Sequence, residues 1–311
     1  MIAKNHQSTF HKETESLASL FTRHFFTITS LFILLAVACT SSSKNSPQLV
    51  IGGIPDQDVS LLEERFDGIA NLMADELGIE VVYKPSVTYA ALVAGFRQGD
   101  VGLAWFGGLT GVQARIADPG SKAIAQRPKD EKFRSAFIVS SEINGESIEN
   151  LAGLSFTFGS ESSTSGHLMP RFYLMEAGID PDNDFDGRPS YSGSHDKTWK
   201  QVEAGVFQGG ALNEAVWQNA LDEGRIDTSK VRALTISPTY FDYHWMAGSQ
   251  VDTKFGEGTV DRIQNFLTGL SSEDKKSAET LERFGTDRFI QTENGNYSAI
   301  EDTARKLGLV E

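Results

Sequence analysis

The feature that most constrains the fold is a regular alternation of short apolar runs with longer segments of helical periodicity, beginning at Leu49. The runs 49–51, 81–83 and 101–105 are nearly all apolar, which is typical of strands buried on both faces of a parallel sheet. Between the first two, apolar residues recur at helical spacing from Leu62 to Leu77, and Ser60 with Glu63 fits a capping box at the helix start.

The middle of the chain repeats this scheme. Residues 154–158 are predicted to form a strand, followed by a helix that ends at Gly178. A further strand is predicted near 207–212, with a helix from about Glu214, and the last third from Gly258 has helical periodicity. This pattern predicts an α/β protein with parallel sheets covered by helices.

Two apolar runs, 137–140 and 234–237, are interpreted as crossings between two lobes. The first lobe would then be discontinuous, made of residues 48–138 and 238–311, and the second would be residues 139–237. Two α/β lobes joined by two hinge crossings can open and close around a ligand.

The N-terminus has the pattern of an export signal. Residues 25–38 form an apolar run that is too short to span a bilayer but fits the apolar part of a secretory signal. The sequence from Leu35 to Cys39 resembles a bacterial lipobox, which predicts a signal peptide over 1–38, lipidation of Cys39 and a polar tether over 39–47. The alternative is an ordinary signal peptide followed by a chance cysteine. Anchoring by lipid would place the folded part outside the cytoplasm, in the cell envelope.

Composition excludes several classes of function. The formal net charge of −14 argues against nucleic-acid binding, which requires a basic face. Cys39 is the only cysteine, so the chain can form neither an intrachain disulfide nor a zinc–thiolate site, and no cofactor or metal is predicted. The charge does not exclude anion binding, because screening over about 8 Å leaves the local surroundings of a site in control.

The segment from Gly159 to His167 follows a predicted strand and opens a predicted helix. Backbone N–H groups at a helix N-terminus have no partner within the helix and favour anions, and Ser163, Thr164 and Ser165 would add three hydroxyl groups. The segment therefore predicts a site for a tetrahedral oxyanion. The alternative is a serine-rich helix cap with no ligand.

A similar arrangement occurs at residues 192–196, again just before a predicted helix. His195 could donate a hydrogen bond to an anion there, and more strongly when the imidazole is protonated. The alternative is a histidine that caps the helix or lies on the surface.

Signatures of common enzymes are missing from the sequence. It contains no Gly-x-Ser-x-Gly elbow, no His-Glu-x-x-His motif and no phosphate loop with Gly-Lys-Ser/Thr. A hydrolase built from Ser165, His195 and Asp196 can be imagined, but binding alone explains the same donors, so the chain is predicted not to be an enzyme. A sensory module that reports ligand occupancy remains an alternative.

Four segments together resemble the periplasmic phosphonate-binding protein family. They are TYAALVAGFRQGDVGLAWFGG (88–108), SSTSGHLMPRFYL (162–174), GSHD (193–196) and LNEAVW (212–217), and they occur in the order of the family. The resemblance covers roughly residues 48–270. It implies the two-lobed type II solute-binding fold, with the ligand between the lobes, and ABC permease subunits as partners.

The resemblance also implies the ligand-binding residues. The family's Ser-Thr-Ser turn corresponds to Ser163, Thr164 and Ser165, its histidine to His195, and the tyrosine that opens its second helix to Tyr89. Acidic residues that meet the ligand's amine correspond to Glu214 and Asp242. Phe106 stands where relatives often have tyrosine, so one hydroxyl donor is missing, which puts the ligand rather than the fold in doubt.

Relatives of this family are linked to phosphite or selenate as well as to phosphonates. A selenate dianion has no proton at neutral pH, so buried carboxylates beside it would repel it, whereas a phosphonate can keep one proton. Glu214 and Asp242 therefore favour a ligand with a proton or an amine if both face the cleft. If Glu214 is only an acid at a helix start, that argument fails.

Overall fold

The computed structural model describes residues 47–311. The predicted signal peptide and the lipidation site Cys39 lie outside the described residues, as does almost all of the predicted tether.

The first sheet has six strands in the order β11-β4-β10-β3-β1-β2. The strand β1 pairs in parallel with both β2 and β3, as the apolar runs predicted, whereas β10 is antiparallel to β3 and β4. The strands are β1 (Leu49–Gly53), β2 (Val81–Tyr83), β3 (Leu103–Phe106), β4 (Lys122–Gln126), β10 (His244–Ala247) and β11 (Ile290–Gln291).

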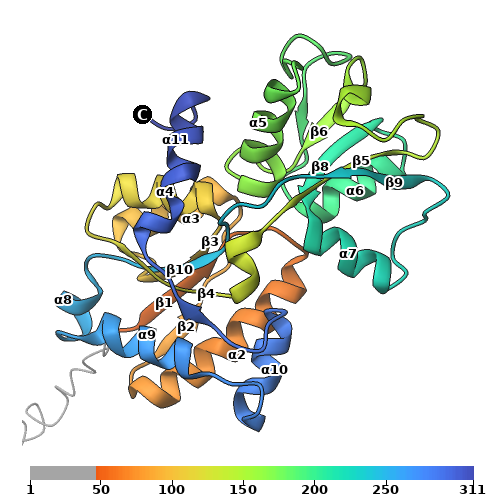
Figure 1. The fold of residues 1–311 in the computed structure, drawn as a ribbon. Helices are drawn as coiled ribbons and strands as arrows, with labels where there is room; N and C mark the ends of the chain where they lie inside the picture. The colour runs from red at the N-terminus through yellow and green to blue at the C-terminus, as the bar shows by residue number, and fades with distance from the viewer. Residues whose placement is uncertain (1–46) are drawn as a thin grey trace, which may run out of the picture. The chain divides into compact units, whose positions relative to one another are not determined.

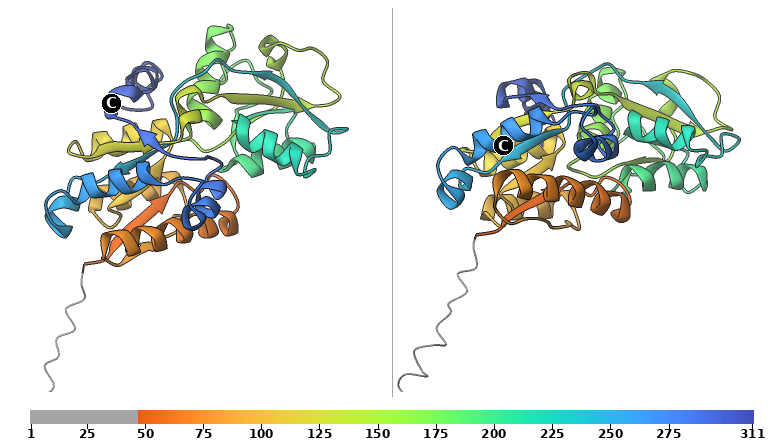
Figure 2. Two further views of the ribbon diagram at one scale, coloured as in Figure 1. Left: turned by 60° about the horizontal axis from the view of Figure 1, so that its bottom comes forward. Right: turned by 90° about the horizontal axis from the view of Figure 1, so that it is seen from below.

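Helices cover this sheet on both faces. In Figures 1 and 2 the helices α9 and α10 lie beside α2, and α11 lies beside α4. The helices are α2 (Val59–Leu77), α3 (Tyr89–Gln98), α4 (Gly108–Ala117), α8 (Val251–Phe255), α9 (Thr259–Gly269), α10 (Lys275–Arg283) and α11 (Ser298–Lys306), with a short 3₁₀ turn, η4 (Asn294–Tyr297), before α11.

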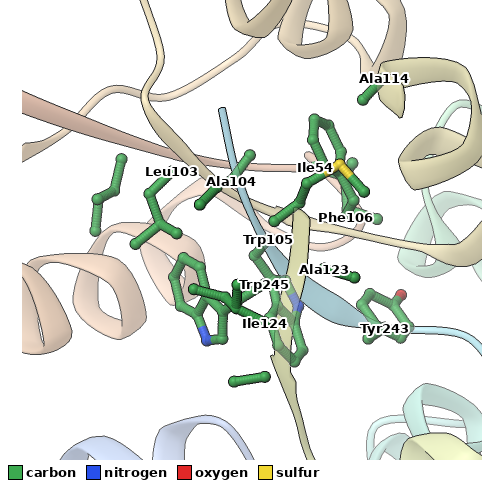
Figure 3. Packing of buried hydrophobic residues seen from close by; sticks show 14 of the residues in the cluster. Ile54, Leu103, Ala104, Trp105, Phe106, Ala114, Ala123, Ile124, Tyr243 and Trp245 are labelled. Carbon is green, nitrogen blue, oxygen red and sulfur yellow. The ribbon is translucent and has the colours of Figure 1, made fainter. Parts of the chain in front are cut away.

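Aromatic rings form the centre of this first core. Trp105 on β3 and Trp245 on β10 are buried with their ring centroids 5.4 Å apart, and Tyr243 stacks on Trp105 at 5.7 Å (Figure 3). The glycine at the end of β1 is required by this packing, since a Cβ on Gly53 would lie within 3 Å of the Phe66 ring. Buried aromatic rings therefore pack closely against the carboxyl ends of β1 and β3.

The second sheet has five strands in the order β7-β6-β8-β5-β9. Alternate residues of β5 point to opposite faces, so Phe137 and Val139 join one hydrophobic cluster while Ala136 and Ile138 join another. The strands are β5 (Ser135–Ser140), β6 (Phe156–Phe158), β7 (Ser190–Tyr191), β8 (Gly209–Asn213) and β9 (Val231–Ile236); the helices are α5 (Met169–Glu176), α6 (His195–Glu203) and α7 (Glu214–Asp222), with η2 (Ile148–Leu151) and η3 (Thr164–Leu168) as shorter turns.

The chain passes between the sheets twice. The runs interpreted as crossings, 137–140 and 234–237, lie largely in the neighbouring strands β5 and β9 of the second sheet, where they form the last four residues of β5 and the last three of β9. The connecting segments are residues 127–134, which include the 3₁₀ turn η1 (Pro128–Lys132), and residues 237–243. These segments pair through Phe133 and Tyr240, whose backbones exchange hydrogen bonds of 2.8 and 3.0 Å. The division of the chain into lobes at residues 138 and 238 stays a prediction.

No helix within residues 47–311 has the length and the apolar character needed to cross a bilayer.

Candidate functional site

The Ser-Thr-Ser turn opens a helix, as predicted, but through an unusual turn. After β6 the chain enters η3, a single π-helical turn that continues into α5, and such turns are frequent at functional sites. The Ser163 hydroxyl group caps the turn by accepting a hydrogen bond from the backbone N–H of Gly166 at 3.0 Å. Ser163, Thr164 and Ser165 are all buried.

Thr164 contacts the helix α4, which packs on the six-stranded sheet. Its hydroxyl oxygen accepts a hydrogen bond of 2.9 Å from the backbone N–H of Leu109, in the first turn of α4. Asp242 Oδ1 accepts another, of 2.8 Å, from the N–H of Gly108. A Cβ on Gly107 would lie 3.0 Å from Asp242 Oδ1 and 3.2 Å from Thr164 Oγ1, so these two side chains converge on the start of α4.

The carboxyl group of Asp242 is only half satisfied. Oδ2 is buried and has no hydrogen-bond partner among the described residues. Burial raises the pKa of Asp242 from 3.8 to about 7, although the Gly108 N–H and the Thr164 hydroxyl group oppose the rise. Near neutral pH this group can therefore either donate a hydrogen bond to an oxyanion or accept one from an oxyanion that carries a proton.

Tyr89 is the second group with an unused polar atom. It begins α3, is buried, and its hydroxyl group has no hydrogen-bond partner within residues 47–311. Burial, and then the charges of Asp56 and Asp242, raise the pKa of Tyr89 well above its ordinary value, while the nearby Ser163 hydroxyl group opposes this. Tyr89 therefore lies with the Ser-Thr-Ser turn and Asp242, as a neutral donor.

Phe106 contributes no polar group. Its ring is fully buried at the end of β3 and packs edge-on against Phe96, with centroids 5.3 Å apart.

His195 is buried in a chain of hydrogen bonds. Its Nδ1 accepts from the backbone N–H of Asn213 at 3.3 Å, so a neutral ring carries its proton on Nε2, 3.4 Å from the Tyr243 hydroxyl oxygen. Burial lowers the pKa of His195, with Asp56 and Asp196 opposing. The neutral imidazole is thus favoured over the protonated form that would be the stronger donor.

Asp56 and Tyr243 were not identified from the sequence. Asp56 lies in the loop after β1, and its Oδ2 accepts a hydrogen bond of 2.7 Å from the Tyr243 hydroxyl group. Both residues are buried. Asp56 follows the carboxyl end of a parallel strand, which is where α/β sheets bind ligands, and that position is the signal that could have found it.

Glu214 is not brought into this group. It is the first residue of α7, where Asn213 is the cap, and its Oε2 is paired with Arg134 Nε at 2.8 Å. It lines a cavity of about 150 Å³ together with Lys129, Lys132 and Arg134, and its side chain is partly exposed. A contact between Glu214 and the ligand stays a prediction, and its position agrees with the alternative of an acid at a helix start.

The remaining groups suit anion binding. They combine the turn η3 and its hydroxyl groups with a neutral histidine and with the carboxyl group of Asp242, which can hold a proton. Within residues 47–311 there is no group of three or more His, Cys, Asp or Glu side chains that could hold a metal ion.

Comparison with known proteins finds relatives that are named for the binding or import of phosphorus oxyanions. The chain is 39% identical over 297 residues to the probable ABC transporter phosphite-binding protein PhnD1 of Prochlorococcus marinus, covering 94% of this chain and all of that protein. It is 26% identical over 259 residues to the phosphate-import protein PhnD of Mycolicibacterium smegmatis, covering 75% of this chain and 78% of that one.

Comparison with solved structures finds binding proteins of the same kind. The structure of Prochlorococcus marinus PhnD1 in complex with methylphosphonate matches with a TM-score of 0.83 and 41% identity, over 86% of this chain and all of the other. A binding protein component of an ABC phosphonate transporter from Pseudomonas aeruginosa matches with a TM-score of 0.73 at 18% identity, over 83% and 86% of the two chains, which concerns the fold alone. These matches confirm the expected two-lobed type II solute-binding fold.

The family model described as "ABC transporter, phosphonate, periplasmic substrate-binding protein" matches residues 51–297. Because this match covers most of the chain, and because a relative of 39% identity is matched over its whole length, the chain belongs to the family of periplasmic substrate-binding proteins of phosphonate ABC transporters.

Proposed function

We propose that this protein captures a small phosphorus oxyanion that keeps one proton, such as phosphite or methylphosphonate, for an ABC importer. The observation that carries the proposal is that two buried polar atoms beside the Ser-Thr-Ser turn, Tyr89 Oη and Asp242 Oδ2, have no hydrogen-bond partner within residues 47–311. Buried polar atoms are rarely left unpaired unless a ligand or water completes them. The names of the relatives support the class, since they refer to phosphite, methylphosphonate and phosphate.

The proton requirement follows from Asp242. With its pKa raised to about 7, this carboxyl group and a singly protonated phosphorus oxyanion can share a proton in a short hydrogen bond. A sulfate or selenate dianion brings no proton, so it is held only if Asp242 is itself protonated. Selectivity against such dianions is therefore expected to increase as Asp242 loses its proton, up to the pH at which the phosphorus oxyanion also becomes a dianion.

An amine on the ligand is not favoured. The family resemblance implied Glu214 and Asp242 as partners for an ammonium group. The carboxylate of Glu214 is paired with Arg134, so Asp242 alone of these two acids faces the Ser-Thr-Ser turn. The proposal therefore places phosphite and methylphosphonate ahead of 2-aminoethylphosphonate.

The proposal extends to anchoring and partners. Lipid on Cys39 would hold the protein at the membrane through the tether 39–47, with the binding unit outside the cytoplasm. The lobes, residues 48–138 with 238–311 and residues 139–237, would close on the anion and deliver it to the permease subunits without catalysing a reaction.

Calorimetry tests the ligand directly. Phosphite, methylphosphonate, phosphate, 2-aminoethylphosphonate, selenate and sulfate are titrated into wild-type protein, Thr164→Val and the control Thr157→Val. Thr157 is also buried, but its hydroxyl group bonds to the backbone of its own strand, so only Thr164→Val is expected to weaken binding. The tightest binding is expected for phosphite or methylphosphonate. Tightest binding of selenate or sulfate would show that the proposed ligand is wrong.

A further inference from the structure

The loop between β1 and α2, residues 54–58, contacts the first turn of α6. The backbone N–H of His195 donates to the carbonyl oxygen of Asp56 at 3.0 Å, and the backbone N–H of Asp58 donates to Asp196 Oδ2 at 3.0 Å. The loop belongs to the six-stranded sheet and α6 belongs to the five-stranded sheet. Both hydrogen bonds therefore join the two halves of the fold, directly beside the candidate site.

Helix α2 lacks a side-chain cap of its own. The sequence suggested a capping box at Ser60 and Glu63, but the helix begins at Val59, and the residue at its start, Asp58, makes no capping hydrogen bond with its side chain. Asp196, from α6, accepts the backbone N–H of Asp58 itself, so it places a carboxylate at the start of α2 without capping the N–H groups of the first turn. A negative charge there is favourable because the helix dipole is positive at the N-terminus.

Apart from the Asp58 N–H, Asp196 has one charged partner among the described residues. It is 1% exposed, and its Oδ1 has no hydrogen-bond partner among the described residues, with Arg225 Nη1 at 3.7 Å as a paired cation. Lys200, one turn further along α6, lies 3.5 Å from Asp58 Oδ2, but both side chains are about half exposed. Of these two contacts, the one from the Asp58 N–H to Asp196 is therefore the more buried. It adds to the hydrogen bonds that join the halves at Thr164 and His195.

We propose that Asp196 is a latch that holds the two lobes closed over the bound anion and so slows its release. This inference rests on the proposed function, because it assumes that the lobes open to admit the ligand. The bond between Asp196 and Asp58 joins two lobes, so it must break on opening. Asp196 is a positioning residue: it acts on the ligand by keeping His195 and Asp56 together.

The first test compares release rates. Phosphite and methylphosphonate binding is followed by stopped flow for Asp196→Ala, Asp196→Asn and the control Glu203→Ala. Glu203 lies on the same helix and also accepts a backbone N–H, that of Asp227, but within the same lobe. Asp196→Ala is expected to raise koff about tenfold with kon unchanged, since one charge-assisted hydrogen bond is lost. Asp196→Asn keeps an acceptor and should raise koff by about threefold, and Glu203→Ala should change neither rate.

The second test removes the donor. Asp58 has a φ of −59°, which proline adopts without strain, so Asp58→Pro deletes the N–H and Asp58→Ala deletes only the side chain. Relative to Asp58→Ala, Asp58→Pro should raise koff as Asp196→Ala does, and combining Asp58→Pro with Asp196→Ala should add nothing further. Unchanged koff in Asp196→Ala, or the same increase in Glu203→Ala, would overturn the latch.

Failure of the proposed function would look different, because none of the six anions would then bind the wild-type protein. In that case the latch is tested without ligand, by a distance between spin labels at Val87→Cys and Val206→Cys in the full chain carrying Cys39→Ser. Both label positions are exposed. Asp196→Ala should lengthen the distance, and identical distance distributions with and without Asp196→Ala would overturn the latch on their own.

Discussion

Replacing Tyr89 with phenylalanine should change stability and binding in opposite directions. The Tyr89 hydroxyl group is buried and has no hydrogen-bond partner among residues 47–311. The loss of its hydration on folding therefore lowers the free energy of unfolding. An unsatisfied buried polar group costs about 1–3 kcal/mol. Tyr89→Phe keeps the ring and removes this group, so the free energy of unfolding without ligand should rise by about 1 kcal/mol or more.

Binding should weaken for the same reason that stability improves. We expect the Tyr89 hydroxyl group to donate to the bound oxyanion, and a hydrogen bond to a charged group contributes about 1.5–3 kcal/mol. Since 1.4 kcal/mol corresponds to a factor of ten, the dissociation constant for phosphite or methylphosphonate should rise roughly 10- to 100-fold.

Urea unfolding and calorimetry measure the two quantities on the same preparations. Tyr297→Phe is the matched control, because Tyr297 is equally buried but its hydroxyl group donates to Gln126 Oε1 at 2.7 Å. That change should lower stability by about 1 kcal/mol and leave binding unchanged. If Tyr89→Phe is destabilising, or if it binds phosphite and methylphosphonate as tightly as the wild type does, the role assigned to Tyr89 is refuted.

Three further predictions concern other residues. The raised pKa of Asp242 means that the folded protein holds this proton more tightly than the unfolded chain, so its contribution to stability is present below about pH 4 and is lost as the pH rises through about 7; urea unfolding should show wild-type stability falling relative to Asp242→Asn over that interval, and parallel curves would contradict this. Because Glu214 is paired with Arg134, Glu214→Gln should leave the calorimetric affinity for phosphite within about twofold, whereas a tenfold change would return Glu214 to the site. Labelled fatty acid should enter the wild type but not Cys39→Ala, and incorporation into both would exclude lipidation at Cys39.

Local sequence patterns were sufficient where a structure depends on neighbouring residues. The apolar runs that became β1, β2 and β3 and the hydroxyl-rich helix start at Ser163 are set by periodicity and by capping chemistry. The family resemblance implied that Tyr89 opens a helix, and α3 begins at Tyr89 because Thr88 caps it by accepting from the backbone N–H of Ala91. These features form the part of the site that the sequence could predict.

Contacts between distant segments could not be predicted in the same way. Asp56 and Tyr243 are 187 positions apart in sequence, and their hydrogen bond exists only because β10 returns antiparallel between β3 and β4. The carboxylate at the start of α2 likewise comes from Asp196, 138 positions after Asp58, and the capping box predicted at Ser60 was wrong because the helix begins at Val59. The pairing of Glu214 with Arg134 depends on the connecting segment before β5, which periodicity does not describe.

A crystal structure of the full chain carrying Cys39→Ser, grown with phosphite, tests the central claim most directly. The account predicts one phosphite with its oxygens within hydrogen-bond distance of Tyr89 Oη, Asp242 Oδ2 and the Ser-Thr-Ser turn, with the bond from Asp58 to Asp196 intact. Phosphite bound instead in the cavity lined by Lys129, Lys132 and Arg134, with Tyr89 and Asp242 still without partners, would contradict it.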